Sequence, residues 1–355
     1  MFDIQITQVE IRRMRPEDEQ NLPFGSIFTD HMFIVDYEEN LGWHNPRIVP
    51  YQDISISPAA MVFHYGQAVF EGLKAYRTHS GKVLLFRPNK NIERINLSCE
   101  RLCMPQIPAT LFFDGMKTLV DLDKDWLPKS EGTALYIRPF MIATEPHLGV
   151  RPSKTYQFMM ILSPVGTYYQ EGLEPIKIWV EKNYARTVKG GIGNVKVAGN
   201  YAASLKSQSE AQKIGYAQVL WLDGIEKKYI EEVGSMNIFF KIQGKLITPI
   251  LNGSILNGVT RDSVITLCKQ RNVAVEERQI SIEEIKAAYD QGILEECFGT
   301  GTAAVISPVG ELRLDDESLL INQGEIGDLT SSLYDTLIGI QTGQIVGPAG
   351  WSVEI

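Results

Sequence analysis

One lysine follows a run of glycines, and its chemistry is the first question that the sequence raises. Residues 190–208 read GGIGNVKVAGNYAASLKSQ, so that Gly190, Gly191 and Gly193 precede Lys196. A glycine-rich loop before a helix often binds phosphate, whereas a lysine amine can also attack a carbonyl carbon. An ordinary loop lysine is the third interpretation.

The phosphate-loop interpretation fails at its diagnostic positions. A P-loop has glycine directly before its lysine and serine or threonine directly after it. Here Val195 and Val197 occupy those two positions. The dinucleotide fingerprint GxGxxG fails as well, because Lys196 stands where its third glycine belongs. A nucleotide-binding module is therefore not favoured.

A covalent role for Lys196 makes further demands on the chain. A desolvated lysine amine forms a Schiff base with an aldehyde, as in pyridoxal phosphate enzymes. Such a cofactor needs an acid at its pyridine nitrogen and donors around its phosphate. Glu232 opens the run EVGSMNIF and is a candidate for the acid. Val259 and Thr260 follow Gly258 at a predicted helix start, where backbone N–H groups suit a phosphate.

A turn of small residues is a further candidate for anion binding. The run FGTGTAA (298–304) offers backbone N–H groups and the Thr302 hydroxyl. Each candidate also has an ordinary structural interpretation. The FGTGTAA run can be a plain strand-to-strand turn, Glu232 a surface acid and Gly258 a helix cap.

The elements that must position these residues predict an α+β chain. Helical spacing predicts helices at 89–102, 258–272 and 281–292. In the helix 89–102, the spacing predicts that Arg94 points away from the apolar face. A capping box formed by Ser281 and Glu284 begins the helix 281–292. Because strands and helices do not alternate regularly, a doubly wound nucleotide fold is not indicated. Apolar runs predict strands at 31–37, 82–88, 156–166, 176–181 and 217–224, and short antiparallel strands within 229–249.

Length and composition set the outer limits. A chain of 355 residues favours two domains, and the run GTYYQEGLEP predicts a linker at 166–175 between domains 1–165 and 176–355. The net charge of −9 argues against sequence-independent nucleic-acid binding, which needs clustered basic residues. No apolar run has the length of a membrane span, and no apolar signal core opens the chain. We therefore expect a cytoplasmic protein with no membrane partner.

Several blocks together resemble a known family. The lysine segment, EVGSMNIF, LIT and LNGVTR, in this order and spacing, are similar to the signature of the class IV aminotransferases, the fold-type IV pyridoxal phosphate enzymes. FGSIFTDHM (24–32), HYGQAVFEGLKAYR (64–77) and YIRPF (136–140) resemble the branched-chain amino acid aminotransferases among them. The resemblance runs from about Phe24 to Gly310.

The resemblance implies a small α/β N-terminal domain, a larger C-terminal domain with a pseudo-barrel of strands, and pyridoxal 5′-phosphate as cofactor. Lys196 would form the Schiff base and move the proton between Cα and C4′. Glu232 would pair with the pyridine nitrogen, and Tyr201 would hydrogen-bond the ring hydroxyl. The phosphate would be bound by Arg94, Val259, Thr260 and Thr302.

The same resemblance implies transamination between L-leucine, L-isoleucine or L-valine and 2-oxoglutarate, which gives branched 2-oxo acids and L-glutamate. Arg138 would bind the second carboxylate of glutamate. The HLGV run (147–150) is similar to a loop that family members lend to the partner's active site, which implies a homodimer. No metal is expected. The substrate pocket would be formed by Phe24, Tyr65, Phe70, Tyr136, Tyr168, Thr302 and Ala303.

Two other functions remain open at this point. A D-amino acid aminotransferase or an aminodeoxychorismate lyase shares the lysine, the acid and the phosphate elements, but lacks the long N-terminal blocks. A non-catalytic phosphate-binding module would need the anion sites but no lysine–acid pair. Leucine, isoleucine and valine are not ranked, because one methylene changes discrimination by only about 1–3 kcal/mol.

Overall fold

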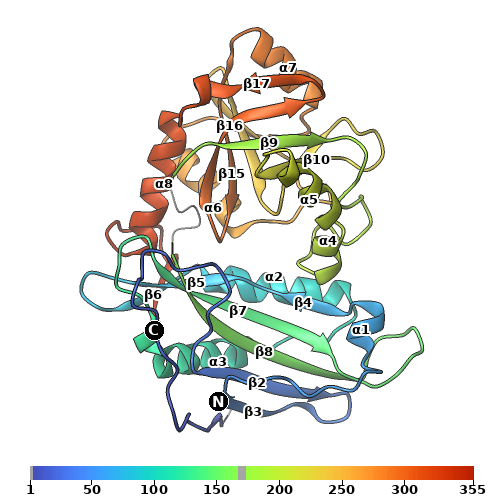
Figure 1. Ribbon diagram of the computed structural model, residues 1–355, viewed down its shortest axis with the longest axis vertical. Coiled ribbons are helices and arrows are strands. Elements are labelled where there is room, and N and C mark those ends of the chain that lie inside the picture. Colours follow the sequence, from blue (N-terminus) through green and yellow to red (C-terminus); the bar gives the residue numbers. More distant parts are fainter. Residues whose placement is uncertain (1–2, 167–172) are drawn as a thin grey trace. The chain divides into compact units, whose positions relative to one another are not determined.

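The computed structural model describes residues 3–166 and 173–355, which form two compact units (Figure 1). The first unit contains Met1–Gln170, Lys196–Ala198 and Gly339–Ile355, and the second contains Glu171–Val195 and Gly199–Ile338. Residues 167–172 of the predicted linker lie outside the described part of the chain. The domain bounds expected from the sequence stay a prediction.

The first unit is built on one sheet with mostly antiparallel neighbours. Val353 pairs with Leu85, which explains why the C-terminal segment belongs to this unit rather than to the second half of the chain. Strand β4 (Ala68–Phe70) pairs with β7 beside the main path. That path runs β1 (Gln5–Ile6), β3 (Gly42–Pro50), β2 (His31–Glu38), β8 (Thr155–Val165), β7 (Ala134–Ala143), β5 (Leu73–Arg77), β6 (Val83–Phe86) and β18 (Ser352–Glu354).

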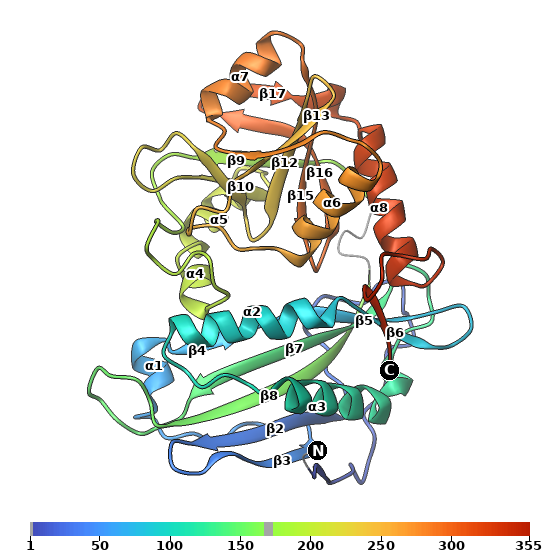
Figure 2. The same cartoon turned by 180° about the vertical axis from the view of Figure 1, so that it is seen from behind.

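Helices α2 (Pro88–Arg101) and α3 (Ala109–Leu122) lie in front of this sheet in Figure 2. The ring of Phe112 in α3 stacks on Phe158 of β8, with ring centroids 6.1 Å apart. A side chain at Gly115 would come within 2.7 Å of the Phe33 ring, so only glycine lets α3 approach the sheet this closely. The short helices α1 (Met61–Tyr65) and η1 (Lys124–Trp126) complete the unit.

The second unit is built on a mixed sheet. Strands β9, β10 and β16 are parallel neighbours, and so are β13 and β14, whereas the other pairs are antiparallel. Strand β17 (Glu317–Leu320) pairs with β16. The sheet runs β11 (Ile230–Val233), β10 (Gln218–Leu222), β9 (Ile176–Glu181), β16 (Val305–Leu314), β15 (Leu294–Gly301), β12 (Asn237–Ile242), β13 (Lys245–Pro249) and β14 (Val275–Arg278).

Helices α5, α6 and α7 of the second unit pack against this sheet. Ala211 of α5 packs on Val219 and Trp221 of β10. The helix start at Ser281 is confirmed, since the Glu284 N–H donates to the Ser281 hydroxyl at 3.1 Å, whereas the Glu284 carboxylate pairs with Arg278. Among the described residues, no helix is both long and apolar enough to cross a membrane. The helices are α4 (Ala198–Ala202), α5 (Leu205–Lys213), α6 (Val259–Gln270), α7 (Ile282–Asp290), η2 (Ile321–Gly324) and α8 (Asp328–Gln341).

The predicted helices and strands are confirmed, with ends that differ by a few residues. The predicted helix 89–102 is α2, and 258–272 is α6, which ends at Gln270. The predicted strand 82–88 is shorter, because Pro88 begins α2. The run 229–249 forms the three strands β11, β12 and β13.

Candidate active site

Lys196 is anchored within the first unit by its backbone. Its N–H donates to the Ser98 hydroxyl of α2 at 2.9 Å, and its carbonyl accepts from the Phe70 N–H of β4 at 3.1 Å. The next residue, Val197, forms a β-bridge with Val69. The Lys196 Nζ lies 4.8 Å from the centroid of the Phe70 ring, a geometry that attracts a cation. The glycine-rich segment therefore presents this lysine from a fixed backbone.

Arg94, the predicted phosphate ligand, lies close to the lysine and is held by a carboxylate. Its Nε and one terminal nitrogen donate to the two oxygens of Glu71 at 2.7 and 2.8 Å. Asn91 donates to the same carboxylate at 2.8 Å. Arg94 is buried rather than solvated, and Glu71 is its buried partner.

The charge of Glu71 is set by these neighbours. Burial raises the pKa of its carboxyl. The charge and hydrogen bonds of Arg94, together with Lys196 and Asn91, outweigh this effect and hold the pKa below its ordinary value. Glu71 is thus an ionised, fully buried partner that fixes the direction of Arg94. The sequence analysis did not select this residue, because a glutamate in HYGQAVFEGLKAYR carries no separate signal.

Four of the predicted substrate residues gather in the first unit. Arg138 donates to the Tyr136 hydroxyl at 3.0 Å, and its guanidinium lies 4.9 Å from the Phe70 ring centroid. Phe24 meets the Tyr136 ring edge-on at 5.0 Å. A side chain at Gly72 would overlap the Tyr136 hydroxyl, so glycine is required there. The cluster presents aromatic surface around the half-buried guanidinium of Arg138.

A second lysine lies beside this cluster. Lys74 stands opposite Tyr136 in the pairing of β5 with β7 and is buried. Burial lowers the pKa of its ammonium group to about 8, because a low-dielectric surrounding disfavours the charged form.

Tyr65, a further predicted substrate residue, contacts the HLGV run. Tyr65 ends α1 and donates its hydroxyl to the carbonyl of Leu148, in the HLGV run. Tyr168 lies outside the described residues.

In the second unit, Tyr201 and Glu232 line the same small hollow, as expected of two residues that would contact one cofactor ring. Glu232 is buried on β11 and forms an ion pair with Arg186. Its other oxygen lies 3.4 Å from the Asn237 amide nitrogen. Arg186 lines the hollow too, although it comes from the segment before the glycine-rich loop.

The glycine-rich loop closes one side of this hollow. Asn200 donates to the carbonyls of Ile192 and Val195 at 2.7 and 2.9 Å, and so holds the loop in place. A side chain on Gly193 would come within 2.1 Å of the Ser254 carbonyl oxygen. Glycine is needed here because the backbone of the loop approaches Ser254 closely, and the shape of the loop determines where the neighbouring residues lie.

The predicted helix start at Gly258 is confirmed as the start of α6. Within the described residues, no side chain caps this helix. The backbone N–H groups in the first turn of a helix are donors that suit an anion, and in α6 the first turn contains Val259 and Thr260. A side chain on Gly258 would overlap Oδ1 of Asn237. Asn237 thus links the helix start to Glu232, a connection that the sequence analysis missed.

Thr302 and Ala303 form the turn between β15 and β16, so the ordinary interpretation of this run as a strand-to-strand turn is correct. That turn extends the end of β15 where Thr300 pairs with Asn237. Its small residues therefore follow the strand end nearest to Asn237. Whether the turn also binds an anion stays a prediction.

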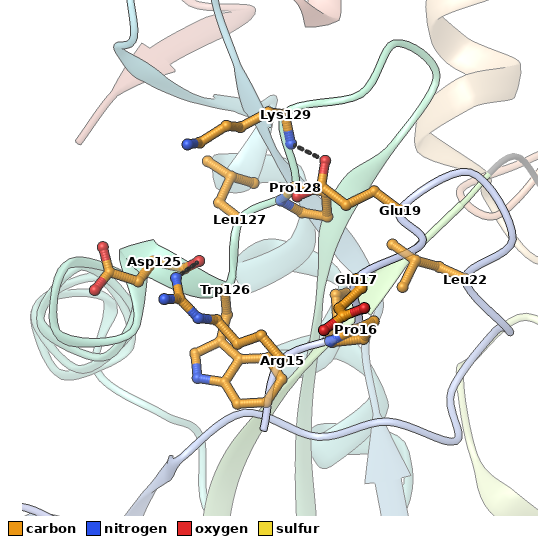
Figure 3. A pocket seen from close by; sticks show the side chains of 11 residues that line it. Arg15, Pro16, Glu17, Glu19, Leu22, Asp125, Trp126, Leu127, Pro128 and Lys129 are labelled. Carbon is orange, nitrogen blue, oxygen red and sulfur yellow. Dashed lines mark hydrogen bonds between the residues drawn. The ribbon is translucent and has the colours of Figure 1, made fainter. Parts of the chain in front are cut away.

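A larger hollow in the first unit contains none of the predicted residues. It is lined by the N-terminal segment and by the residues after α3 (Figure 3). Glu19 accepts from the Lys129 N–H at 2.7 Å, and Arg15 donates to the Asp125 carbonyl at 2.8 Å. These contacts hold the two segments together. Within the described residues, no group of three or more His, Cys, Asp or Glu could hold a metal ion.

Comparison with known proteins agrees with this arrangement. The model of the family described as amino-transferase class IV matches residues 68–312. Branched-chain-amino-acid aminotransferase 2 of Bacillus subtilis (strain 168) is 59% identical over 352 residues, which are 99% of this chain and 97% of the relative.

Two solved structures have the same fold. The Escherichia coli branched-chain amino acid aminotransferase superposes with a TM-score of 0.75 at 27% identity, over 91% of this chain and 98% of that one. A second branched-chain amino acid aminotransferase, complexed with N-(5′-phosphopyridoxyl)-L-glutamate, gives 0.75 at 25% identity, over 90% of this chain and 97% of that one. The predicted α+β class and fold type are confirmed. With a family match over most of its length and a full-length relative at 59% identity, the chain belongs to the class IV aminotransferase family.

Proposed function

We propose that this protein transfers the amino group of L-leucine, L-isoleucine or L-valine to 2-oxoglutarate, with pyridoxal 5′-phosphate as cofactor. The observation that carries the proposal is the buried pair of Glu232 and Arg186 beside Tyr201, in a chain whose relatives bear the name of this enzyme. A buried acid paired with a cation is suited to the ring nitrogen of such a cofactor.

The residues present fit this cofactor. Arg94, the first turn of α6 at Val259 and Thr260, and Thr302 would hold its phosphate. Tyr201 would donate to the ring oxygen, and Glu232 would face the ring nitrogen. When bound, the cofactor supplies an aldehyde that takes up the amino group and a ring that withdraws electrons from the substrate Cα.

The chain's own residues would then bind, orient and move protons. Lys196 Nζ would bind the cofactor aldehyde in the resting enzyme and afterwards carry the proton to and from the substrate Cα. The Glu71–Arg94 pair lies near this amine, and Glu71 would hold the proposed phosphate ligand in a fixed direction. Arg186 would keep Glu232 in place as charge develops on the ring.

The first-unit aromatic cluster would accept both substrates. Phe24, Phe70 and Tyr136 present apolar surface to a branched side chain. Arg138, whose Nε is buried and has no hydrogen-bond partner in the described residues, would bind the second carboxylate of 2-oxoglutarate or glutamate. Tyr65, Tyr168, Thr302 and Ala303 complete the proposed pocket. A homodimer is proposed from the HLGV resemblance, and a cytoplasmic location stays a prediction.

Activity assays test the proposal. The purified protein, supplied with pyridoxal phosphate and 2-oxoglutarate, should convert L-leucine, L-isoleucine and L-valine and form glutamate. Turnover of D-alanine alone would show the D-amino acid specificity instead. If the protein is colourless and takes up no pyridoxal phosphate, the enzyme function is wrong.

Replacing the proposed nucleophile gives the second test. Lys196→Ala should lose transamination by orders of magnitude, because no other amine would replace it. Borohydride should fix the cofactor on Lys196 in the unmodified protein and leave this variant unlabelled. Lys189→Ala, at an exposed position of the same segment, is the control and should keep its rate. Near-normal turnover by Lys196→Ala would exclude covalent catalysis at this residue.

A further inference from the structure

Glu231 is a second buried glutamate, directly before Glu232 on β11, and none of the proposed steps uses it. Its exposed fraction is 3%, the same as that of Glu232. Glu231 is the extra residue where the pairing of β11 with β10 shifts register, and its hydrogen-bond partners differ from those of Glu232. Glu232 pairs with Arg186, whereas Glu231 makes a hydrogen bond with the Ser254 hydroxyl.

Counting hydrogens around Ser254 shows which form of Glu231 the structure requires. The Ser254 hydroxyl is in hydrogen-bond contact with Oε1 of Glu231 and lies 2.6 Å from Oδ1 of Asn252. The backbone N–H of Ser254 donates to the same Asn252 atom at 3.0 Å, so this atom must be the amide oxygen. A hydroxyl has one proton to donate and can satisfy only one of the two oxygens. The other contact needs a proton from the carboxyl group of Glu231.

The rest of the surroundings also favour a neutral carboxyl. The second oxygen of Glu231 is buried and has no hydrogen-bond partner in the described residues, a costly position for a full charge. Burial raises the pKa of Glu231, with a further raising effect from Asp223. The contacts with Ser254, Arg186 and Asn252 act in the opposite direction but do not outweigh burial.

Ser254 connects Glu231 to the proposed site. Its carbonyl oxygen accepts from Arg186 at 3.1 Å and from the Thr187 hydroxyl at 2.9 Å. The side chain of Ser254 is thus fixed by Glu231 and Asn252, while its backbone fixes Arg186. Arg186 in turn holds Glu232. The charges of Arg186 and Glu232 already balance, so a neutral Glu231 adds a hydrogen bond without adding a second negative charge.

We propose that Glu231 is a neutral carboxylic acid that donates its proton to Ser254 and thereby positions Arg186 against Glu232. It is a positioning residue that acts through Ser254 and touches neither substrate nor cofactor. This role rests on the proposed function of Glu232. The protonation state itself does not, and can be measured separately.

Carboxyl-labelled glutamate provides the direct test. In the ¹³C NMR spectrum of the full chain, the signal that disappears in Glu231→Gln belongs to Glu231. At pH 7 it should have the chemical shift of a protonated carboxyl, and it should titrate only at higher pH. Glu226, exposed in the preceding loop, provides the reference signal of a glutamate in solvent. An ionised Glu231 at pH 7 would overturn the proposal.

The positioning role is tested on the protein loaded with pyridoxal phosphate. Glutamine is neutral and keeps an N–H donor for Ser254, so Glu231→Gln should leave kcat and the pH midpoint of the cofactor's visible absorption within about twofold and a few tenths of a pH unit of the original. Glu231→Ala should lower kcat at least tenfold and shift that midpoint, because Ser254 loses its support.

The outcomes separate the two claims. The positioning role would be overturned if Glu231→Ala kept the original kcat and absorption midpoint. It would also be overturned if Glu231→Gln lost as much kcat as Glu231→Ala. A protein that binds no pyridoxal phosphate would refute the proposed function, and the NMR titration would still decide whether Glu231 carries a proton.

Discussion

Replacing Glu71 with glutamine tests whether the buried carboxylate holds Arg94 through its charge. Glu71 is fully buried and accepts two hydrogen bonds from Arg94 and one from Asn91. Glutamine has nearly the same shape but only one acceptor oxygen and no charge. In Glu71→Gln, one nitrogen of Arg94 loses its acceptor, and the guanidinium stays buried without its counter-ion.

The expected loss of stability is large for a single substitution. Breaking a buried ion pair by neutralising one partner costs about 3–5 kcal/mol of unfolding free energy. Urea unfolding at pH 7 measures it, followed by tryptophan fluorescence, since Trp126 and Trp351 are buried in the first unit. Glu93→Gln is the matched control on the same helix. It breaks an exposed contact with Lys90, which contributes only about 0.2–0.5 kcal/mol.

The pH dependence gives the sign of the effect. The folded protein holds the pKa of Glu71 below its ordinary value, so its contribution is present above the unfolded pKa and is lost as the pH falls through the folded pKa. The difference between the original protein and Glu71→Gln should therefore shrink below about pH 4. A Glu71→Gln variant as stable as Glu93→Gln at pH 7, or a difference that does not change with pH, would refute the reasoning.

Two further predictions concern the glycine-rich loop and the buried lysine. Gly193→Ala should lower the unfolding free energy by about 1–3 kcal/mol, because its side chain would overlap the Ser254 carbonyl. Gly199→Ala is the control and should not lower it, since its side chain would be 3.5 Å from its nearest neighbour. Equal urea midpoints for the two variants would contradict this prediction. Lys74 binds its proton less tightly in the folded chain, where its pKa is about 8 rather than 10.5. The charged lysine therefore lowers the unfolding free energy of the original protein relative to that of Lys74→Met, and this difference should narrow as the pH rises from 8 to 10. Urea unfolding at both pH values measures this difference, and a difference that stays constant would show that the lysine stays charged.

The sequence predicted most of the elements of this fold, because their signals are local. Apolar periodicity placed α2 and α6, and Ser281 with Glu284 marked the start of α7. The placement of β18 against β6 could not be predicted, since residues 352–354 carry no signal for a partner in the first half of the chain. Pairing between distant segments depends on the whole sheet and not on either strand alone.

The family blocks selected Lys196, Arg94, Tyr201 and Glu232, and the structure brings Tyr201 and Glu232 to one hollow of the second unit. Their support could not be read from the sequence. Glu71 is 23 residues from Arg94, and Arg186 is 46 residues from Glu232. A lone charged residue looks the same in sequence whether it is solvated or paired in the core.

The two adjacent glutamates of β11 show this division most clearly. The sequence by itself determined that two acids stand side by side in IEEVGSMN and that the second matches a family motif. Only the tertiary structure decided that Glu232 faces a guanidinium while Glu231 faces a hydroxyl that has no second proton to donate. The physical reason is that the charge of a buried carboxyl depends on its partners, and these come from distant segments of the chain.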